Sequence, residues 1–233
     1  CLGHPGKPRS FGGRPVTRLP VFAVFLVVGP VRAADPAIDA LAAESLKAWD
    51  VPGLAVVVVR NGETTHLRGY GRRSVAAADA VTPDTLFPLA SCTKAFTATA
   101  AAALVDAGRL GWDDPVRQHL PTFRLADPDA DRRVTVRDLL AHRTGVGGHD
   151  LLFYRAPWPL DEAVRRAGKL PPTGPFRGGY EYSSLMVAAA GRAVAAAAGD
   201  PWETVVRDRL CGPLGMTSVT FTSAEAAKTA DRA

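Results

Sequence analysis

Two alanine-rich apolar segments constrain the fold of this 233-residue chain more than any other feature. The first runs from Ser91 to about Ala107 and is followed by Gly108, a residue that readily adopts the conformation ending a helix. The second, SLMVAAAGRAVAAAAG, covers residues 184–199 and also ends in glycine. Each segment predicts an apolar helix, and with 47% hydrophobic residues the chain has enough material for a core.

Residues 35–49 predict another helix, ahead of the first apolar one. Asp35 is a good N-cap, and Pro36 fits the first helical position because a backbone N–H would be unsatisfied there anyway. The apolar residues that share one stripe of this helix are Ile38, Leu41 and Trp49.

Two β-rich runs follow, joined by Asn61-Gly62, the strongest short sequence indication of a hairpin. Farther along, residues 135–138 resemble a capping box that opens a short helix. Asp200 is predicted to cap one more helix, with Pro201 at its first position. A hairpin followed by helices predicts a single α+β domain.

The excess positive charge lies in the first 34 residues. The formal net charge is +5, from 28 basic and 23 acidic residues. Residues 1–34 contain no acid and five basic residues, namely Lys7, Arg9, Arg14, Arg18 and Arg32. From Asp35 onward the chain contains 23 basic and 23 acidic residues, so this part has no formal net charge. A nucleic-acid-binding domain would carry its excess charge on the domain itself, so we expect no nucleic-acid partner.

The same segment predicts a signal peptide. A basic stretch precedes the apolar run LPVFAVFLVVGPV, and small residues flank a possible cleavage after Ala33. The run is too short to span a bilayer comfortably. We expect residues 1–33 to be removed, the protein to be exported to the periplasm or secreted, and no stable membrane span to remain. The alternative is a buried core strand.

Cysteine and histidine give no metal pattern. Cys92 and Cys211 lack a CxxC or Cys/His ligand spacing, so two isolated buried thiols are expected rather than a bridge. The histidines that follow the predicted signal peptide form no HExxH pattern and are expected to be ordinary hydrogen-bonded residues. They are His66, His119, His142 and His149. We expect neither a metal nor another cofactor.

Ser91 and Lys94 are the first candidate catalytic pair. At a spacing of three they lie on one helical face, one turn apart. A serine hydroxyl is a weak nucleophile that needs a nearby base, and lysine serves only when burial or charge keeps it neutral. The apolar flanks are compatible with a desolvated Lys94. Spacing alone also fits a different interpretation, an N-cap serine followed by a surface lysine.

The surrounding sequence resembles the β-lactamase-related serine hydrolases of the class C type, which include D-Ala-D-Ala carboxypeptidases and esterases. The resemblance rests on VPGLAVVVVRNGETTHLRGYG, TPDTLFPLASCTK, GRLGWDDPVRQHLP, VTVRDLLAHRTGV and LCGPLGMTSVTF, in order, from residue 35 to about 222. It implies a β-lactamase/transpeptidase-like fold, with an N-terminal helix and hairpin followed by a helical region. It also implies Ser91 as the acylated nucleophile and Lys94 as its base partner.

The resemblance supplies two further site residues. The family motif Tyr-x-Asn aligns with Tyr182, Ser183 and Ser184, which implies that Tyr182 shares the proton transfer and that Ser184 contacts the substrate. Tyr180 is a rival for the tyrosine position. A serine hydroxyl reaches less far than the usual asparagine amide, which weakens the expectation of β-lactam turnover more than that of ester or peptide hydrolysis.

The family's third motif, Lys/His-x-Gly on a strand, has no counterpart in this sequence. That strand carries one oxyanion N–H, and removing such a donor costs about 3 kcal/mol of transition-state stabilisation. We therefore expect residues 34–233 to be a C-terminally truncated hydrolase domain, inactive alone, with C-terminal sheet strands missing. The hairpin edge and the apolar faces of the helices should then be exposed.

The leading hypothesis is an exported serine hydrolase that acylates and deacylates Ser91. Its substrate would be a small molecule or peptide: a β-lactam, a D-Ala-D-Ala peptide or a carboxylic ester. The alternative is a non-catalytic relative that keeps the fold and binds peptidoglycan or another ligand, since a fold does not fix a function.

Overall fold

The computed structural model describes residues 35–152, 154 and 156–233, so the predicted signal peptide lies outside the described residues. No helix in this part of the chain is long and apolar enough to cross a membrane. In chain order the elements are α1 (Pro36–Trp49), β1 (Gly53–Arg60), β2 (Glu63–Ser74), β3 (Ala77–Ala80), the 3-10 turn η1 (Ala90–Cys92), α2 (Thr93–Asp106), α3 (Val116–His119), α4 (Pro128–Arg133), α5 (Val136–Leu140), η2 (Asp150–Leu152), α6 (Leu160–Arg166), η3 (Ala167–Lys169), α7 (Ser184–Ala198), α8 (Trp202–Val206), the π-helical turn η4 (Arg207–Cys211) and α9 (Ser223–Ala226).

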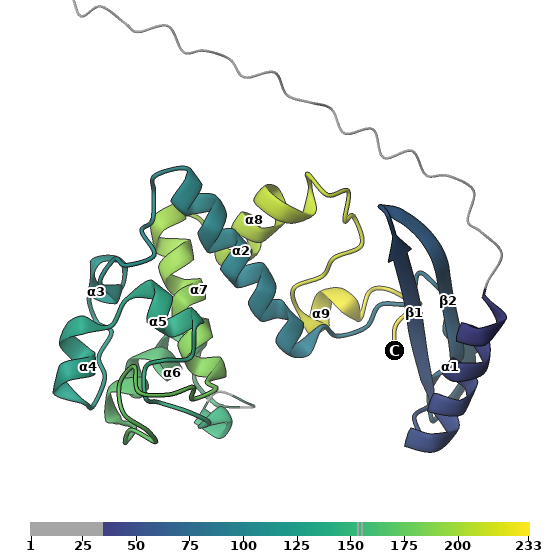
Figure 1. The fold of residues 1–233 in the computed structure, drawn as a ribbon, viewed down its shortest axis with the longest axis horizontal. Coiled ribbons are helices and arrows are strands. Elements are labelled where there is room, and N and C mark those ends of the chain that lie inside the picture. Colours follow the sequence, from purple (N-terminus) through teal and green to yellow (C-terminus); the bar gives the residue numbers. More distant parts are fainter. Residues whose placement is uncertain (1–34, 153, 155) are drawn as a thin grey trace, which may run out of the picture.

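The predicted α+β architecture is confirmed, with the sheet and α1 on one side and the helical region on the other (Figure 1). The sheet is antiparallel, in the order β1-β2-β3. Asn61 and Gly62 form the predicted hairpin turn, and both have the positive φ angles, 52° and 80°, that a tight primed turn requires. The turn sets the register, because Arg60 pairs directly with Glu63 across it.

Helix α1 has the predicted cap, and much of its apolar stripe is exposed. The Asp35 side chain accepts a hydrogen bond from the Ala37 N–H at 2.9 Å. Ala42 is the buried residue of the helix, whereas Leu41 and Trp49 are 62% and 79% exposed. Exposure of this apolar helix face agrees with the expectation that the strands covering it are missing.

Polar contacts join α1 to β2. The Tyr70 hydroxyl donates to one oxygen of Asp39 at 2.6 Å, and Arg68 donates to the other at 2.9 Å. His66 is buried, with Nε2 2.7 Å from the Tyr70 hydroxyl and Nδ1 accepting the Asp35 N–H. Burial and the bond to Asp39 raise the pKa of Tyr70 to about 12. These bonds hold α1 against β2.

The other face of the hairpin is apolar and exposed. Val57 and Val59 are 59% and 61% exposed, and Leu67, the cross-strand partner of Val57, is 41% exposed. Within the part of the chain that the structure describes, β1 has β2 as its only strand neighbour. The predicted exposure of the hairpin edge is confirmed, and the exposed apolar face of the hairpin was not predicted.

Helices α2 and α7 pack against each other through small side chains. Ala100, Ala101 and Leu104 of α2 are fully buried and share one core cluster with Ala193 and Val194 of α7. Alanine side chains allow two helices to approach closely, and buried residues of this kind interdigitate with few voids. A second cluster surrounds Phe123 on the other side of α7.

Helix α8 begins differently from the prediction. It starts at Trp202, its N-cap is Pro201, and Asp200 makes no capping bond with its side chain. Instead, the Asp200 N–H donates to the carbonyl of Ala195, which places Asp200 in the turn that closes α7. The predicted cap is wrong because α7 and α8 are joined too tightly for a separate cap residue.

Residues near the end of the chain secure the segment that leads to Ser91. The Asp231 carboxylate accepts hydrogen bonds from the hydroxyls of Thr82 at 2.6 Å and Thr85 at 2.5 Å. Leu86 forms a parallel bridge with Arg232. The approach to the first candidate site residue is thus tied to a segment that lies about 146 residues farther along the chain.

The predicted capping box at Thr135 and Asp138 is confirmed, and it continues into a buried ion pair. Asp138 accepts two hydrogen bonds from Arg177, at 2.9 and 2.7 Å, as well as two from Thr135. Burial acts to raise the pKa of Asp138, but the bonds from Arg177 and Thr135 hold it below its ordinary value of 3.8. Asp138 therefore joins α5 to the loop that precedes α7.

We expect Asp138→Asn to lower the free energy of unfolding by about 2 kcal/mol, because Arg177 and Thr135 lose a charged partner. The matched control is Asp113→Asn, which breaks an exposed pair with Arg137 and should cost less than about 1 kcal/mol. Urea denaturation at neutral pH measures both. Equal losses would contradict a special role for the buried pair.

Candidate active site

The structure brings all four predicted site residues together. The hydroxyl oxygens of Ser91 and Tyr182 are 2.6 Å apart. The Lys94 ammonium donates to the Ser91 hydroxyl at 3.2 Å and to the Ser184 hydroxyl at 3.3 Å. Residues about 90 positions apart in the sequence thus form one continuous hydrogen-bonded set.

Ser91 lies in the 3-10 turn Ala90–Cys92, and α2 begins directly after it at Thr93 rather than at Ser91 as predicted. Ala90, immediately before it, has φ of +45°, a left-handed conformation that is unfavourable for a residue with a Cβ. The following turns continue into α2 and carry Lys94 on the same face. The backbone at Ala90 is therefore strained where the chain turns to present Ser91.

The loop that carries Tyr182 is held by His142. The Ser183 N–H donates to His142 Nδ1 at 3.0 Å, and the Glu181 N–H donates to the His142 carbonyl at 2.8 Å. The His142 ring stacks on the Tyr182 ring, with centroids 4.7 Å apart. Ser183 also caps α7, since its side chain accepts the Met186 N–H.

Of the two rival tyrosines, Tyr182 is the one hydrogen-bonded to Ser91. Tyr180 is 67% exposed and contacts the edge of the His142 ring instead, at a centroid distance of 5.2 Å. The sequence position that aligned with the family motif is thus the position that faces the serine.

Lys94 lowers the pKa of Tyr182. Its ammonium lies 4.7 Å from the centre of the Tyr182 ring. Hydrogen bonding from Lys94, and then from Ser91, holds the pKa of Tyr182 below its ordinary value of 10.0. A hydroxyl with a lowered pKa beside a cation is suited to accept and return a proton.

The site is open to solvent. Ser91 is exposed, Tyr182 is 40% exposed and Lys94 is only partly buried. Cys92 is exposed in the same turn as Ser91, so its predicted burial is wrong, whereas Cys211 is buried as predicted; both thiols are free. Among the described residues no group of three His, Cys, Asp or Glu side chains could hold a metal ion.

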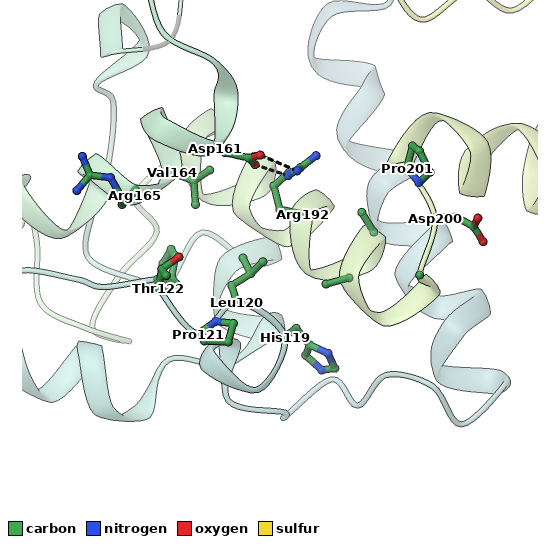
Figure 2. Close-up of a pocket in the computed structure, with 14 residues that line it drawn as sticks. His119, Leu120, Pro121, Thr122, Asp161, Val164, Arg165, Arg192, Asp200 and Pro201 are labelled. Carbon is green, nitrogen blue, oxygen red and sulfur yellow. Dashed lines mark hydrogen bonds and ion pairs between the residues drawn. The ribbon is translucent and has the colours of Figure 1, made fainter.

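A separate cavity of about 710 Å³ lies along the C-terminal half of α7 (Figure 2). His119 and Leu120 lie on one side of it, and Asp161 forms an ion pair with Arg192 on another, with Nε and Oδ1 2.5 Å apart. In the part of the chain that the structure describes, none of the four candidate site residues lines this cavity.

The profile of the protein family described as Beta-lactamase matches residues 38–233. The chain belongs to the beta-lactamase family. It is 36% identical over 194 residues to Unguisins hydrolase ungD' of Aspergillus campestris, covering 79% of this chain and 36% of that protein. It is 34% identical over 204 residues to Esterase EstB of Burkholderia gladioli, covering 81% of this chain and 52% of that protein.

The fold agrees with this assignment. The octameric penicillin-binding protein homologue from Pyrococcus abyssi superposes with a TM-score of 0.74 at 26% identity, covering 85% of this chain and 47% of that one. The predicted β-lactamase/transpeptidase-like fold is confirmed. The chain spans between about a third and a half of the length of these three relatives.

Sequence reasoning missed the part that His142 plays at the site. It was expected to be an ordinary hydrogen-bonded histidine, yet it contacts both the ring and the backbone neighbours of Tyr182. Burial, and then the charge of Lys94, hold the pKa of His142 below its ordinary value of 6.5. A neutral ring is also what Nδ1 needs in order to accept a hydrogen bond.

We expect Ala90→Gly to raise the free energy of unfolding by about 1 kcal/mol, since glycine adopts positive φ without a steric penalty. The matched control is Ala95→Gly, at an exposed position inside α2, which should lower it by about 1 kcal/mol. Urea denaturation of both variants checks the signs. A loss at position 90 would show that the turn is not strained.

The lowered pKa of His142 predicts a stability change in mild acid. The unfolded chain takes up a proton near pH 6.5 and the folded chain does not, so this contribution is complete above pH 6.5 and lost as the pH falls below it. We expect His142→Asn, whose amide oxygen can still accept the Ser183 N–H, to lose less stability between pH 8 and 5 than the wild type. Identical slopes in urea denaturation across that range would contradict this.

Proposed function

We propose that this chain carries the acylation site of an exported serine hydrolase that acts on an ester or amide. The observation that carries the proposal is the hydrogen-bonded set of Ser91, Lys94, Tyr182 and Ser184. Membership of the beta-lactamase family and the relatives named as hydrolase, esterase and penicillin-binding protein homologue support it.

In the proposed reaction the Ser91 oxygen attacks the carbonyl carbon and its proton passes to Tyr182, with Lys94 stabilising the phenolate that accepts it. The tetrahedral intermediate then collapses, the carbon–leaving-group bond breaks, and the proton goes to the departing alcohol or amine. Water repeats the sequence on the acyl-enzyme and releases the acid. The Ser184 hydroxyl, bound to Lys94, lies where it can contact the substrate.

The position of Ser91 favours this chemistry electrostatically. It precedes a 14-residue helix, and the aligned peptide dipoles of such a helix favour negative charge near its first turn. We propose that the second oxyanion donor belongs to sequence that this chain does not contain, as the family resemblance implies. The 233-residue chain alone should then be inactive, because one missing donor costs about 3 kcal/mol.

The candidate substrates are β-lactams, D-Ala-D-Ala peptides and carboxylic esters. The short Ser184 side chain favours ester or peptide hydrolysis over β-lactam turnover. The predicted signal peptide favours a periplasmic or secreted enzyme, where cell-wall peptides are accessible. A non-catalytic peptidoglycan- or ligand-binding relative is the competing function, and the exposed, incompletely enclosed serine is the observation that favours it.

The test uses the product of the complete gene, purified beside its Ser91→Ala variant. Each protein is incubated with a fluorophosphonate probe and, separately, with a labelled penicillin, and mass spectrometry locates the adducts. We expect fluorophosphonate labelling at Ser91 that disappears in Ser91→Ala, because the alanine side chain cannot be phosphonylated.

The penicillin sample separates a penicillin-recognising enzyme from an esterase. A circular-dichroism unfolding curve shows whether each protein is folded. A folded wild-type protein without any adduct would rule out the hydrolase and leave the binding relative.

A further inference from the structure

His142 binds the residues on both sides of Tyr182. The Glu181 N–H donates to the His142 carbonyl at 2.8 Å, and the Ser183 N–H donates to His142 Nδ1 at 3.0 Å. The Tyr182 carbonyl itself accepts the Gly148 N–H at 2.9 Å. Three consecutive residues of the loop are thus fixed through their backbone, two of them by one histidine. Hydrogen bonds of these lengths leave the loop little freedom to slide.

The same histidine also packs against the Tyr182 ring. The two ring planes lie 30° apart with centroids at 4.7 Å, although Tyr182 is 40% exposed. Exposed side chains change rotamers freely unless a neighbour restricts them. The Tyr182 hydroxyl must nevertheless stay 2.6 Å from the Ser91 hydroxyl if it is to take the Ser91 proton. The His142 ring lies where it restricts the rotation that would move the phenol away.

His142 is itself held firmly. It is only 7% exposed, and it follows the last turn of α5 with a φ of +57°. Histidine and asparagine adopt such left-handed angles more often than most other residues. Tyr180 packs against the edge of the His142 ring at a centroid distance of 5.2 Å. The imidazole therefore has a fixed direction toward Tyr182.

The hydrogen bond from Ser183 requires an unprotonated Nδ1, so it exists only while the ring is neutral. Burial, and then the charge of Lys94, hold the pKa of His142 below its ordinary value of 6.5. The titratable groups that face His142 are Lys94 from α2 and three residues of the loop before α7, namely Tyr180, Glu181 and Tyr182. The Glu181 carboxylate accepts a hydrogen bond from Thr173, and Arg177, earlier in the same loop, is bound to Asp138. Protonation of Nδ1 therefore removes the bond to Ser183.

We propose that His142 is a positioning residue for the proton transfer. With a neutral ring it fixes the Tyr182 hydroxyl against Ser91, and when Nδ1 takes up a proton the Ser183 N–H is released and the phenol loses that position. The inference rests on the proposed function, in which Tyr182 takes the Ser91 proton. Because His142 acts through Tyr182, its loss should lower kcat and leave KM nearly unchanged.

The test measures p-nitrophenyl acetate hydrolysis by the product of the complete gene and by two variants, His142→Phe and His142→Asn. Phenylalanine keeps a ring but removes the acceptor, so kcat at pH 8 should fall about tenfold while KM changes less than about twofold. Asparagine keeps an acceptor and fits the positive φ, so kcat should fall only about threefold, for the lost ring contact. His119→Asn is the matched control, because it removes a histidine that is bound to Asp114 and lines the separate cavity. It should change kcat less than about twofold.

The pH profile distinguishes positioning from a general loss of stability. From pH 8 to pH 5 the wild-type kcat should fall at least about twofold more than that of His142→Asn, because asparagine does not titrate in this range. His119→Asn should keep the wild-type profile. Urea denaturation at pH 5 shows whether each protein is folded during the assay.

The outcomes separate the two proposals. Absence of both hydrolysis and fluorophosphonate labelling at Ser91 in the wild type would overturn the hydrolase and the role of His142 together. In an active wild type, an unchanged kcat in His142→Phe or a loss expressed in KM alone would overturn the positioning role alone. Identical pH profiles in His142→Asn and the wild type would do the same, and this comparison still decides if His142→Phe does not fold.

Discussion

The close packing of α2 against α7 is the contact on which the site depends. Ser91 and Lys94 belong to the turn and helix at one side of it, and Ser184 is the first residue of the other. Hydrogen bonds of 2.6 to 3.3 Å across this boundary leave little tolerance for a shift of either helix. The alanine-rich interface fixes the separation because small side chains have no alternative rotamers to adjust it. One additional methyl group in that interface would push α2 and α7 apart and thereby separate Ser91 and Lys94 from Ser184.

The parts of the fold that the sequence predicts best are those with a local physical cause. The Asn61-Gly62 turn, the Asp35 cap and the glycine ends of the apolar helices each depend on a few neighbouring residues, and each is present. The polar contacts of α1 were not predicted, because they join Asp39 to two residues of a strand. That interaction joins residues about 30 positions apart, which a periodic pattern within one helix cannot reveal.

In the candidate site, too, local features were predicted from the sequence and tertiary contacts were not. Spacing placed Ser91 and Lys94 on one face, but only the resemblance to a family connected them with Tyr182 in preference to Tyr180. The structure has Tyr182, and not Tyr180, hydrogen-bonded to Ser91. The sequence does not indicate the strain at Ala90, since alanine is not a residue that predicts positive φ. It does not indicate the contacts of His142 either, because these join residues far apart in the chain. Unusual backbone angles and contacts behind the reacting groups arise from tertiary packing, and they were visible only after the loops had been placed.

The bonds between Asp231 and the two threonines before the nucleophile have a consequence for biosynthesis. They close a loop of about 146 residues, so the segment leading to Ser91 cannot be secured until Asp231 has been synthesised. Non-local contacts of this kind form late, because the entropy of closing the loop opposes them until the intervening helices have packed. During translation the hairpin and α2 can fold first, while the turn that presents the serine is still loose. The turn that presents Ser91 is therefore secured only after the helices between Thr85 and Asp231 have packed.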